Sequence, residues 1–278
     1  MSQLHLRVEA FARIILPLIT LAAYCRPHRP VKKFEIRSDT SSGLYPPAGG
    51  PTVLEFWYAR RPGRNTPVVP PGTSLQVGWA YVFREECELL SFLISEIARK
   101  LLPADQCSIA WLRSHAKATL FLVEEANTVR LPLHAFVHIM PLDDDDPDSG
   151  WILDGSLQQF GWTDWGRFAR PEWYAENFAD LQRMAVYPST PEEHKTMADD
   201  VSRSVYWSRV MEITEQIIAA FPWDSAREEQ DRQVDILLAR AQPQLIAAAQ
   251  EQMSQQDEEE MDSNEDSLDG FSDESEFS

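Results

Sequence analysis

The spacing of apolar residues changes from a helical period to a strand period along the first half of the chain, and a fold of this chain has to contain both elements. Within Arg84–Leu102, apolar residues recur at steps of three and four, which is typical of an amphipathic helix. Within Val129–Met140 they alternate in steps of two, which is typical of a strand. We therefore predict an α+β fold, in which an antiparallel sheet near residues 107–155 packs against the 84–102 helix.

The chain is predicted to have three parts, and proline, glycine and charge mark their limits. Residues 1–52 hold a helix over 3–23 and then a Pro- and Gly-rich connector over 26–52. Residues 53–250 form the α+β domain, which ends in a helical region. Its further elements are expected as strands at Val53–Ala59, Ser108–Arg113, Ala118–Glu124 and Trp151–Asp154, a strand or helix at Leu75–Phe83, and helices at Pro171–Ala185, Ala198–Phe221 and Ser225–Gln250.

The third part, residues 251–278, is an acidic tail. It holds 12 acidic residues and no Lys or Arg, and few of its residues are apolar. Such a segment cannot bury enough apolar surface to offset the entropy that it loses on ordering, so we predict that the tail is disordered.

The net charge of the chain argues against a nucleic-acid partner. The chain carries −19, of which the tail supplies −12, so the body of 250 residues is acidic at −7. Nucleic-acid binding needs Lys and Arg to neutralise phosphates. One basic cluster remains, which we interpret as an exposed connector, with a nuclear-import or phosphate patch as the alternative: Arg26, Arg29, Lys32, Lys33 and Arg37. The expected partner is a protein or peptide, and the oligomeric state stays open.

The N-terminal apolar run is shorter than a membrane span. Ile14–Cys25 is uncharged over 12 residues, whereas a spanning helix needs about 20. Arg7 and Arg13 interrupt the approach to it, and Pro17 lies inside it. We predict an amphipathic or buried helix and no membrane contact, with a cryptic signal-anchor as the alternative.

The cysteine pattern favours free thiols. The three cysteines, Cys25, Cys87 and Cys107, are odd in number, widely spaced and without a CxxC pair, so they indicate neither a disulfide framework nor a zinc site. Free thiols suggest a reducing compartment, and we expect a cytoplasmic or nuclear protein. No metal and no cofactor are expected.

A histidine and an aspartate lie at matching places on two successive strands. His134 is near the start of one strand and Asp154 ends the next, and a hairpin between them brings the strands side by side. Cross-strand neighbours have Cβ atoms about 4.5–5.5 Å apart, so the carboxylate can accept a hydrogen bond from the imidazole. That bond fixes the ring and leaves its other nitrogen free to act as a base. In a shifted register, His138 pairs with Asp154 instead.

The residues around this pair resemble the His-and-Asp hairpin of transglutaminase-like, papain-type cysteine enzymes. The matching positions are His134-Ala135-Phe136-Val137, Gly150-Trp151, Asp154, Ser156 and Gln159-Phe160, where Phe136 replaces the usual Trp and Ser156 the usual Thr. The resemblance covers about 28 of the 278 residues.

The resemblance implies a papain-like core and a nucleophilic cysteine at the start of the preceding helix. Cys87 fits by location, and Ser91 gives the Cys-x-x-x-Ser spacing of such helices. The implied roles are Cys87 as nucleophile, His134 as base and Asp154 as the residue that orients His134. Gln159 and Trp151 are implied as substrate-binding residues. The implied reaction is acyl transfer, meaning amide hydrolysis or deamidation.

The residues beside Cys87 leave a second interpretation open. Glu85, Glu86 and Glu88 flank it, and nearby carboxylates oppose thiolate formation. A cysteine on an apolar helix is also commonly a small core residue. The chain is then a degenerate relative of these enzymes, or a non-catalytic interaction protein whose acidic tail binds basic partners.

Two further groups of residues have a structural interpretation beside a functional one. The aspartates Asp143–Asp146 and Asp148 are predicted to form a solvated hairpin tip, with a calcium site as the alternative. The aromatic residues Trp162, Trp165, Trp173 and Tyr174 are predicted to cover the sheet as core, with a partner-binding groove as the alternative.

Overall fold

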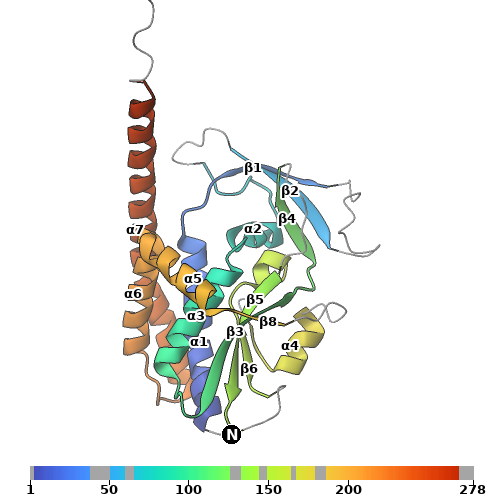
Figure 1. The fold of residues 1–278 in the computed structure, drawn as a ribbon, viewed down its shortest axis with the longest axis vertical. Helices are drawn as coiled ribbons and strands as arrows, with labels where there is room; N and C mark the ends of the chain where they lie inside the picture. Colours follow the sequence, from blue (N-terminus) through green and yellow to red (C-terminus); the bar gives the residue numbers. More distant parts are fainter. Residues whose placement is uncertain are drawn as a thin grey trace, which may run out of the picture.

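The computed structural model is a mixed α/β protein with two sheets and seven α-helices in the residues that it describes, which are 3–37, 51–59, 66–125, 133–143, 149–163, 167–178 and 186–268 (Figure 1). The helices are α1 (Gln3–Cys25), α2 (Leu75–Val82), α3 (Cys87–Leu101), α4 (Pro171–Phe178), α5 (Pro191–Arg203), α6 (Val205–Ala220) and α7 (Arg227–Leu268), with a 3-10 helix, η1 (Leu157–Phe160). The strands are β1 (Val31–Ile36), β2 (Thr52–Tyr58), β3 (Cys107–His115), β4 (Leu120–Glu124), β5 (Leu133–Pro141), β6 (Trp151–Asp154), β7 (Arg167–Ala169) and β8 (Tyr187–Pro188).

The larger sheet has the strand order β7-β6-β5-β3-β8, and all of its pairs are antiparallel. Its centre is β5, which pairs with β3 over its whole length and with β6 through Val137↔Leu153 and Ile139↔Trp151. This confirms the antiparallel sheet that the sequence predicted near residues 107–155, including the hairpin of β5 and β6. Of the aspartates between these two strands, 144–148 lie outside the described residues.

The smaller sheet has the order β1-β2-β4, and β2 runs parallel to β4. Strand β1 lies within the predicted connector of residues 26–52, so the prediction of little regular structure was wrong for 31–36, and residues 38–50 lie outside the described residues. The residues of β1 pair with β2 from Val31↔Tyr58 to Ile36↔Leu54, and the Phe34 and Phe56 rings lie 6.2 Å apart. Pairing with a strand beyond the loop, rather than a local pattern, forms this element.

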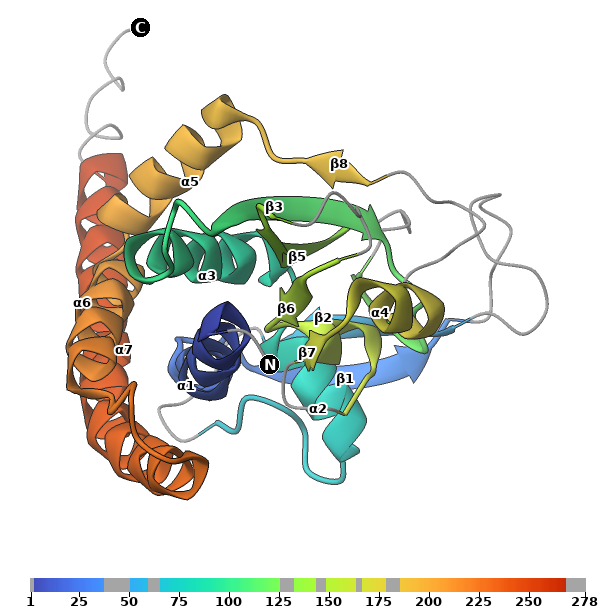
Figure 2. The same ribbon diagram turned by 90° about the horizontal axis from the view of Figure 1, so that it is seen from below.

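The main core lies between the larger sheet and the helices. Figure 2 shows α1 and α3 between this sheet and the pair α6 and α7. Alternate residues of β5, namely Ala135, Val137 and Ile139, face this core, whereas Phe136 packs on the other side of the sheet. The alternation that the sequence predicted for this strand is therefore confirmed. Helix α1 shares the core with α3 and the sheet, so it is part of the same packed unit.

Helix α1 is long and apolar enough, by length and composition, to cross a membrane. In its most apolar window of 18 residues, 67% of the residues are buried inside the protein. Ile14, Ile15 and Ile19 have no exposed surface. The core accounts for the apolar character of this helix, as expected of a buried helix.

The helix predicted over Ala198–Phe221 is in fact two helices that meet at Ser204. The Ser204 hydroxyl accepts a hydrogen bond from the backbone N–H of Trp207, and the Ser204 N–H donates to the carbonyl of Asp200. One residue therefore ends α5 and caps α6. The apolar pattern of the sequence continues across Ser204, so the pattern does not reveal the break. Only the capping hydrogen bonds of Ser204 separate the two helices.

Helix α7 extends beyond the predicted end of the ordered chain. It continues to Leu268 and projects past the body of the protein (Figure 1), and the disorder predicted for residues 251–278 stays a prediction. Residues 269–278 lie outside the described residues. Gln, Glu and Met favour helices, and extending an existing helix avoids the cost of nucleation. A long helix therefore needs no core contacts at its end.

We predict that Gly161→Ala destabilises the protein more than Gly72→Ala. Both glycines have left-handed backbones, with φ of +82° and +84°, and an alanine there costs about 1–2 kcal/mol. A Cβ at Gly161 also lies 2.6 Å from Leu120 Cβ and Thr119 Oγ1, whereas a Cβ at Gly72 meets nothing within 4 Å. The clash adds about 1–3 kcal/mol. Urea unfolding of both variants measures the difference, and equal losses would contradict the close packing of η1 on β4.

Candidate active site

The hairpin of β5 and β6 brings His134 and Asp154 together. His134 Nε2 lies 2.5 Å from Asp154 Oδ2, and the two side chains are 1% and 0% exposed. The alternative pairing with His138 is wrong. His138 lies opposite Ile152 in the register, and its Nε2 bonds to the carbonyl of Ser149 at 3.0 Å. The predicted pair is therefore the one that forms.

The Asp154 carboxylate accepts hydrogen bonds at both of its oxygens. Oδ1 accepts from the backbone N–H of Ser156 at 2.9 Å and from its hydroxyl at 3.3 Å. Oδ2 accepts from the Tyr174 hydroxyl at 2.5 Å as well as facing His134. These donors compensate the removal of a carboxylate from water, so they can hold Asp154 ionised in the interior.

Cys87 is the first residue of α3, and it lies beside His134. A hydrogen bond that the imidazole donates to the Cys87 sulfur contributes to the raised pKa of His134, and the Sγ also lies 3.9 Å from the carbonyl oxygen of Leu133. The helix begins three residues later than predicted, because Glu85 has a left-handed backbone with φ of +64°. The sulfur therefore lies at the N-terminus of α3. The structure brings Cys87, His134 and Asp154 together, and we call these three residues the triad.

The carboxylates that flank Cys87 are neutralised by arginines. Glu86 Oε1 lies 2.8 Å from the Arg26 guanidinium, and Glu88 Oε1 lies 2.7 Å from Arg113. Glu85 is 77% exposed and points toward solvent, 3.4 Å from Arg84. Local sequence suggested three charges that oppose a thiolate. Arg26 lies directly after α1, Arg113 on β3 and Arg84 in the turn before α3, and the sequence spacing does not reveal the first two of these partners.

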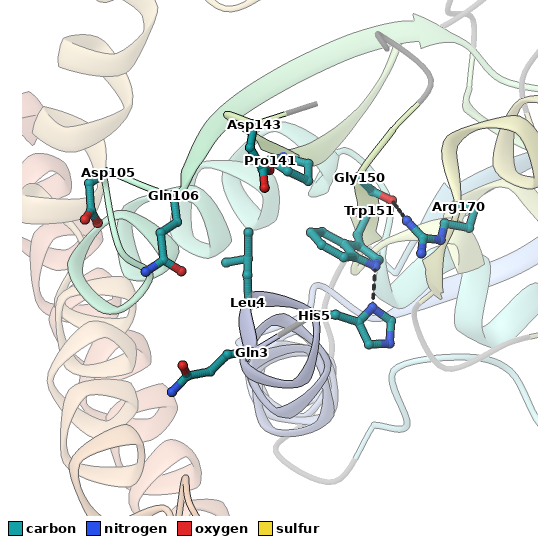
Figure 3. Close-up of a pocket in the computed structure, with 10 residues that line it drawn as sticks. All are labelled: Gln3, Leu4, His5, Asp105, Gln106, Pro141, Asp143, Gly150, Trp151 and Arg170. Carbon is teal, nitrogen blue, oxygen red and sulfur yellow. Dashed lines mark hydrogen bonds between the residues drawn. The ribbon is translucent and has the colours of Figure 1, made fainter. Parts of the chain in front are cut away.

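Gln159 and Trp151, the two predicted substrate-binding residues, lie in different places. The side-chain amide nitrogen of Gln159, on η1, is 3.1 Å from His134 Nδ1. Trp151 is at the opposite end of β6 from Asp154, and its indole N–H donates to His5 Nδ1 on α1 at 3.1 Å (Figure 3). Gln159 therefore contacts the triad through His134, and Trp151 lies away from the triad.

Trp151 lines a separate pocket of about 700 Å³ (Figure 3). Arg170 lies over its indole ring at 5.2 Å and donates to the carbonyl of Gly150. His5 and Asp105 contribute to other walls. This pocket is not lined by a triad residue. In the described ranges, no group of three or more His, Cys, Asp or Glu side chains is arranged to hold a metal ion.

Tyr174 is the site residue that sequence reasoning placed differently. It was grouped with the aromatic residues that cover the sheet, and its ring does pack there, 5.0 Å from the Phe136 ring. Its hydroxyl reaches Asp154 because α4 lies against the side of the sheet that is opposite the main core. No spacing in the sequence connects a residue of α4 to the hairpin, so this contact follows from tertiary packing alone.

The charge state of His134 follows from its neighbours. Burial lowers its pKa, but the Asp154 carboxylate and the Cys87 sulfur outweigh this effect and raise the pKa to about 10. The imidazole is therefore protonated at neutral pH. Burial and Asp154 also raise the pKa of Tyr174, which keeps its hydroxyl a donor. The site thus consists of an imidazolium between a carboxylate and a sulfur.

Comparisons with known proteins add no constraint, because no family model, no curated protein and no solved structure matches the chain.

We predict that Arg26→Ala lowers the free energy of unfolding by about 3 kcal/mol, because the variant leaves the Glu86 carboxylate buried without its partner. Arg203→Ala is the control. Arg203 pairs with Asp200 at 2.9 Å on the surface, with side chains 73% and 56% exposed, so its loss barely changes stability. Chemical unfolding at neutral pH measures both. Equal, small losses would contradict the view that Arg26 compensates the charge before Cys87.

We predict that stability falls with rising pH and that Asp154→Asn reduces this slope. His134 is protonated in the folded protein up to pH about 10, whereas the unfolded chain releases this proton near 6.5. Between these values the folded state binds one more proton, so stability decreases by up to about 1.4 kcal/mol per pH unit. Urea unfolding between pH 7 and 9.5 measures the slope. Asp143→Asn, at an exposed carboxylate, serves as the control, and equal slopes in all three proteins would contradict the pairing.

Proposed function

We propose that the protein is a cysteine-dependent amide hydrolase with a papain-like or transglutaminase-like core. The observation that carries this proposal is the contact of His134 Nε2 with Asp154 Oδ2 at 2.5 Å, with Cys87 on the same imidazole. The three side chains come from α3, β5 and β6, which are separate in the chain. A nucleophile, a base and an orienting carboxylate in contact form the arrangement that acyl transfer requires.

The arrangement of elements supports the proposed core. Helix α3 begins at Cys87 and packs on β3 and β5 of the antiparallel sheet. The strands that carry His134 and Asp154 follow it in the chain and are neighbours in the sheet. The N-terminus of a helix favours negative charge, and an imidazolium beside a sulfur does so too. Both features favour a thiolate at Cys87.

In the first half of the proposed reaction, the Cys87 thiolate attacks the carbonyl carbon of an amide. The electron pair of the carbonyl bond moves to its oxygen, and backbone N–H groups in the first turn of α3 stabilise the resulting oxyanion. The carbon–nitrogen bond then breaks. The His134 imidazolium gives its proton to the departing nitrogen, which leaves as an amine or as ammonia, and an acyl thioester remains on Cys87.

In the second half, water attacks the thioester and His134 accepts its proton. The carbon–sulfur bond breaks, the carboxylic acid leaves, and the thiolate and imidazolium are restored. Asp154 stays ionised throughout and keeps the ring oriented through Nε2. The reaction needs no metal and no cofactor in this scheme, because each proton that His134 gives in the first half returns to it in the second.

The burial of the triad favours a second candidate, a non-catalytic interaction protein that keeps the arrangement as a structural element. Cys87 is 6% exposed, His134 1% and Asp154 0%. Helix α7 projects from the body, and its side chains over 251–256 are mostly exposed. In this alternative the acidic end of α7 is the part that meets basic partners. A buried cysteine of this kind reacts no faster than any other buried cysteine.

We predict that an amide-based thiol-reactive probe labels Cys87 at pH 7 at least about tenfold faster than Cys107. The two cysteines are similarly buried, with 6% and 4% of their surface exposed, but no histidine in the described ranges contacts Cys107, and burial raises its pKa. The thiolate is the reactive form of a cysteine, and the imidazolium and the helix N-terminus beside the sulfur favour it at Cys87. Peptide mapping by mass spectrometry measures labelling at each cysteine.

The controls are single substitutions in the same protein. Cys87→Ala removes the labelled peptide, and His134→Ala reduces the rate at Cys87. His138→Ala leaves it unchanged, because His138 lies on the same face of β5 but bonds to the Ser149 carbonyl. Equal labelling of Cys87 and Cys107, unaffected by His134→Ala, would refute the hydrolase and favour the interaction protein.

A further inference from the structure

Tyr174 and His134 share one oxygen atom of Asp154. The Tyr174 hydroxyl donates to Oδ2 at 2.5 Å, and His134 Nε2 lies 2.5 Å from the same atom. The two residues approach from different sides, since His134 lies on β5 and Tyr174 on α4. Two donors on one carboxylate oxygen divide its negative charge, so each bond is weaker than it would be alone.

The position of the Tyr174 hydroxyl is fixed by its surroundings. The residue is 3% exposed, and its ring lies 5.0 Å from the Phe136 ring and 5.5 Å from the Phe178 ring. The α4 helix is held at its C-terminal end, where the Phe178 carbonyl accepts a hydrogen bond from the Lys117 N–H at 2.7 Å. The hydroxyl therefore cannot turn away from Asp154 without displacing the packing on this side of the sheet.

Among the residues that the structure describes, few charged groups lie close enough to Asp154 Oδ2 to compete with Tyr174 and His134. From α3 the Cys87 sulfur acts on His134 and on Tyr174, and from η1 the neutral amide of Gln159 lies beside Nδ1. On β7, Arg167 is the strand partner of Asp154, but its guanidinium lies over the rings of Trp173 and Phe178, at 5.0 and 5.5 Å. The hydroxyl of Tyr174 is thus the group that shares the charge of Oδ2 with the imidazole.

We infer that Tyr174 is a positioning residue of the triad, which fixes the Asp154 carboxylate and limits how strongly it holds the His134 proton; its role in catalysis rests on the proposed function. The reaction requires His134 to release its proton to the leaving group and to take one back from water. A carboxylate that binds the imidazolium too strongly slows the first of these transfers. Sharing Oδ2 with Tyr174 weakens that hold.

The test is Tyr174→Phe, which removes one oxygen atom and keeps the ring. The charge of Oδ2 then acts on His134 alone, so the pKa of His134 rises. Nitrogen NMR of the imidazole, titrated through the alkaline range, measures this shift in the folded protein, and His134→Gln identifies the signal by its loss. Tyr206→Phe is the matched control, because Tyr206 is equally buried and its hydroxyl donates to a backbone carbonyl, that of Ala22.

A rise of the His134 pKa in Tyr174→Phe and none in Tyr206→Phe supports the inference. An unchanged or lowered value in Tyr174→Phe would overturn it, since a purely structural hydroxyl affects stability alone. The NMR result does not depend on activity. If the shift occurs but Cys87 is inert toward the probe, the proposed hydrolase is wrong and the role of Tyr174 on the carboxylate stands. If Cys87 reacts with the probe and the His134 pKa does not shift, the proposed hydrolase stands and the inferred role of Tyr174 is wrong.

Discussion

A buried carboxylate, that of Asp154, ties together the parts of the protein that surround the candidate site. It ends β6, faces β5 through His134, fixes the turn into η1 through Ser156 and holds α4 through Tyr174. An ion without water needs all of these donors, because an unpaired carboxylate in the interior costs several kcal/mol. The same four bonds that make the fold tolerate the charge also give the imidazole a single orientation. Stability and site geometry therefore have a common origin here.

The other half of the site depends on how α3 begins. Cys87 follows a turn in which Glu85 has a left-handed backbone and Glu86 is buried. Arg26, directly after α1, donates to the Val82 carbonyl and pairs with Glu86. The residue that follows α1 therefore fixes the turn from which α3 begins. A sulfur placed in this way is held by packing of the core and not by the loop around it. The triad thus combines a rigid sheet with a rigid helix end.

The parts of the structure that local patterns specify could be predicted, and the parts made by distant contacts could not. The alternation in Val129–Met140 gave both faces of β5, and the hairpin followed from it, with His134 and Asp154 adjacent. Strand β1 could not be predicted, because pairing with β2 forms it. The break at Ser204 rests on one cap, and the contact of Tyr174 rests on the docking of α4. The ion pairs of arginines with the glutamates beside Cys87 also include contacts between distant segments that could not be predicted.

The central position of α1 bears on how the chain acquires its structure. This helix precedes in the chain the elements that it contacts, among them α3, β6 and α7, and Tyr206 bonds to the carbonyl of Ala22 from 184 residues further along. Contacts between such distant segments require long loops to close, which makes folding slow. The apolar surface of α1 that α7 covers in the folded protein therefore stays uncovered until α7 has been synthesised. Surface of this kind is what chaperones bind during that interval, and the docking of α7 completes its cover.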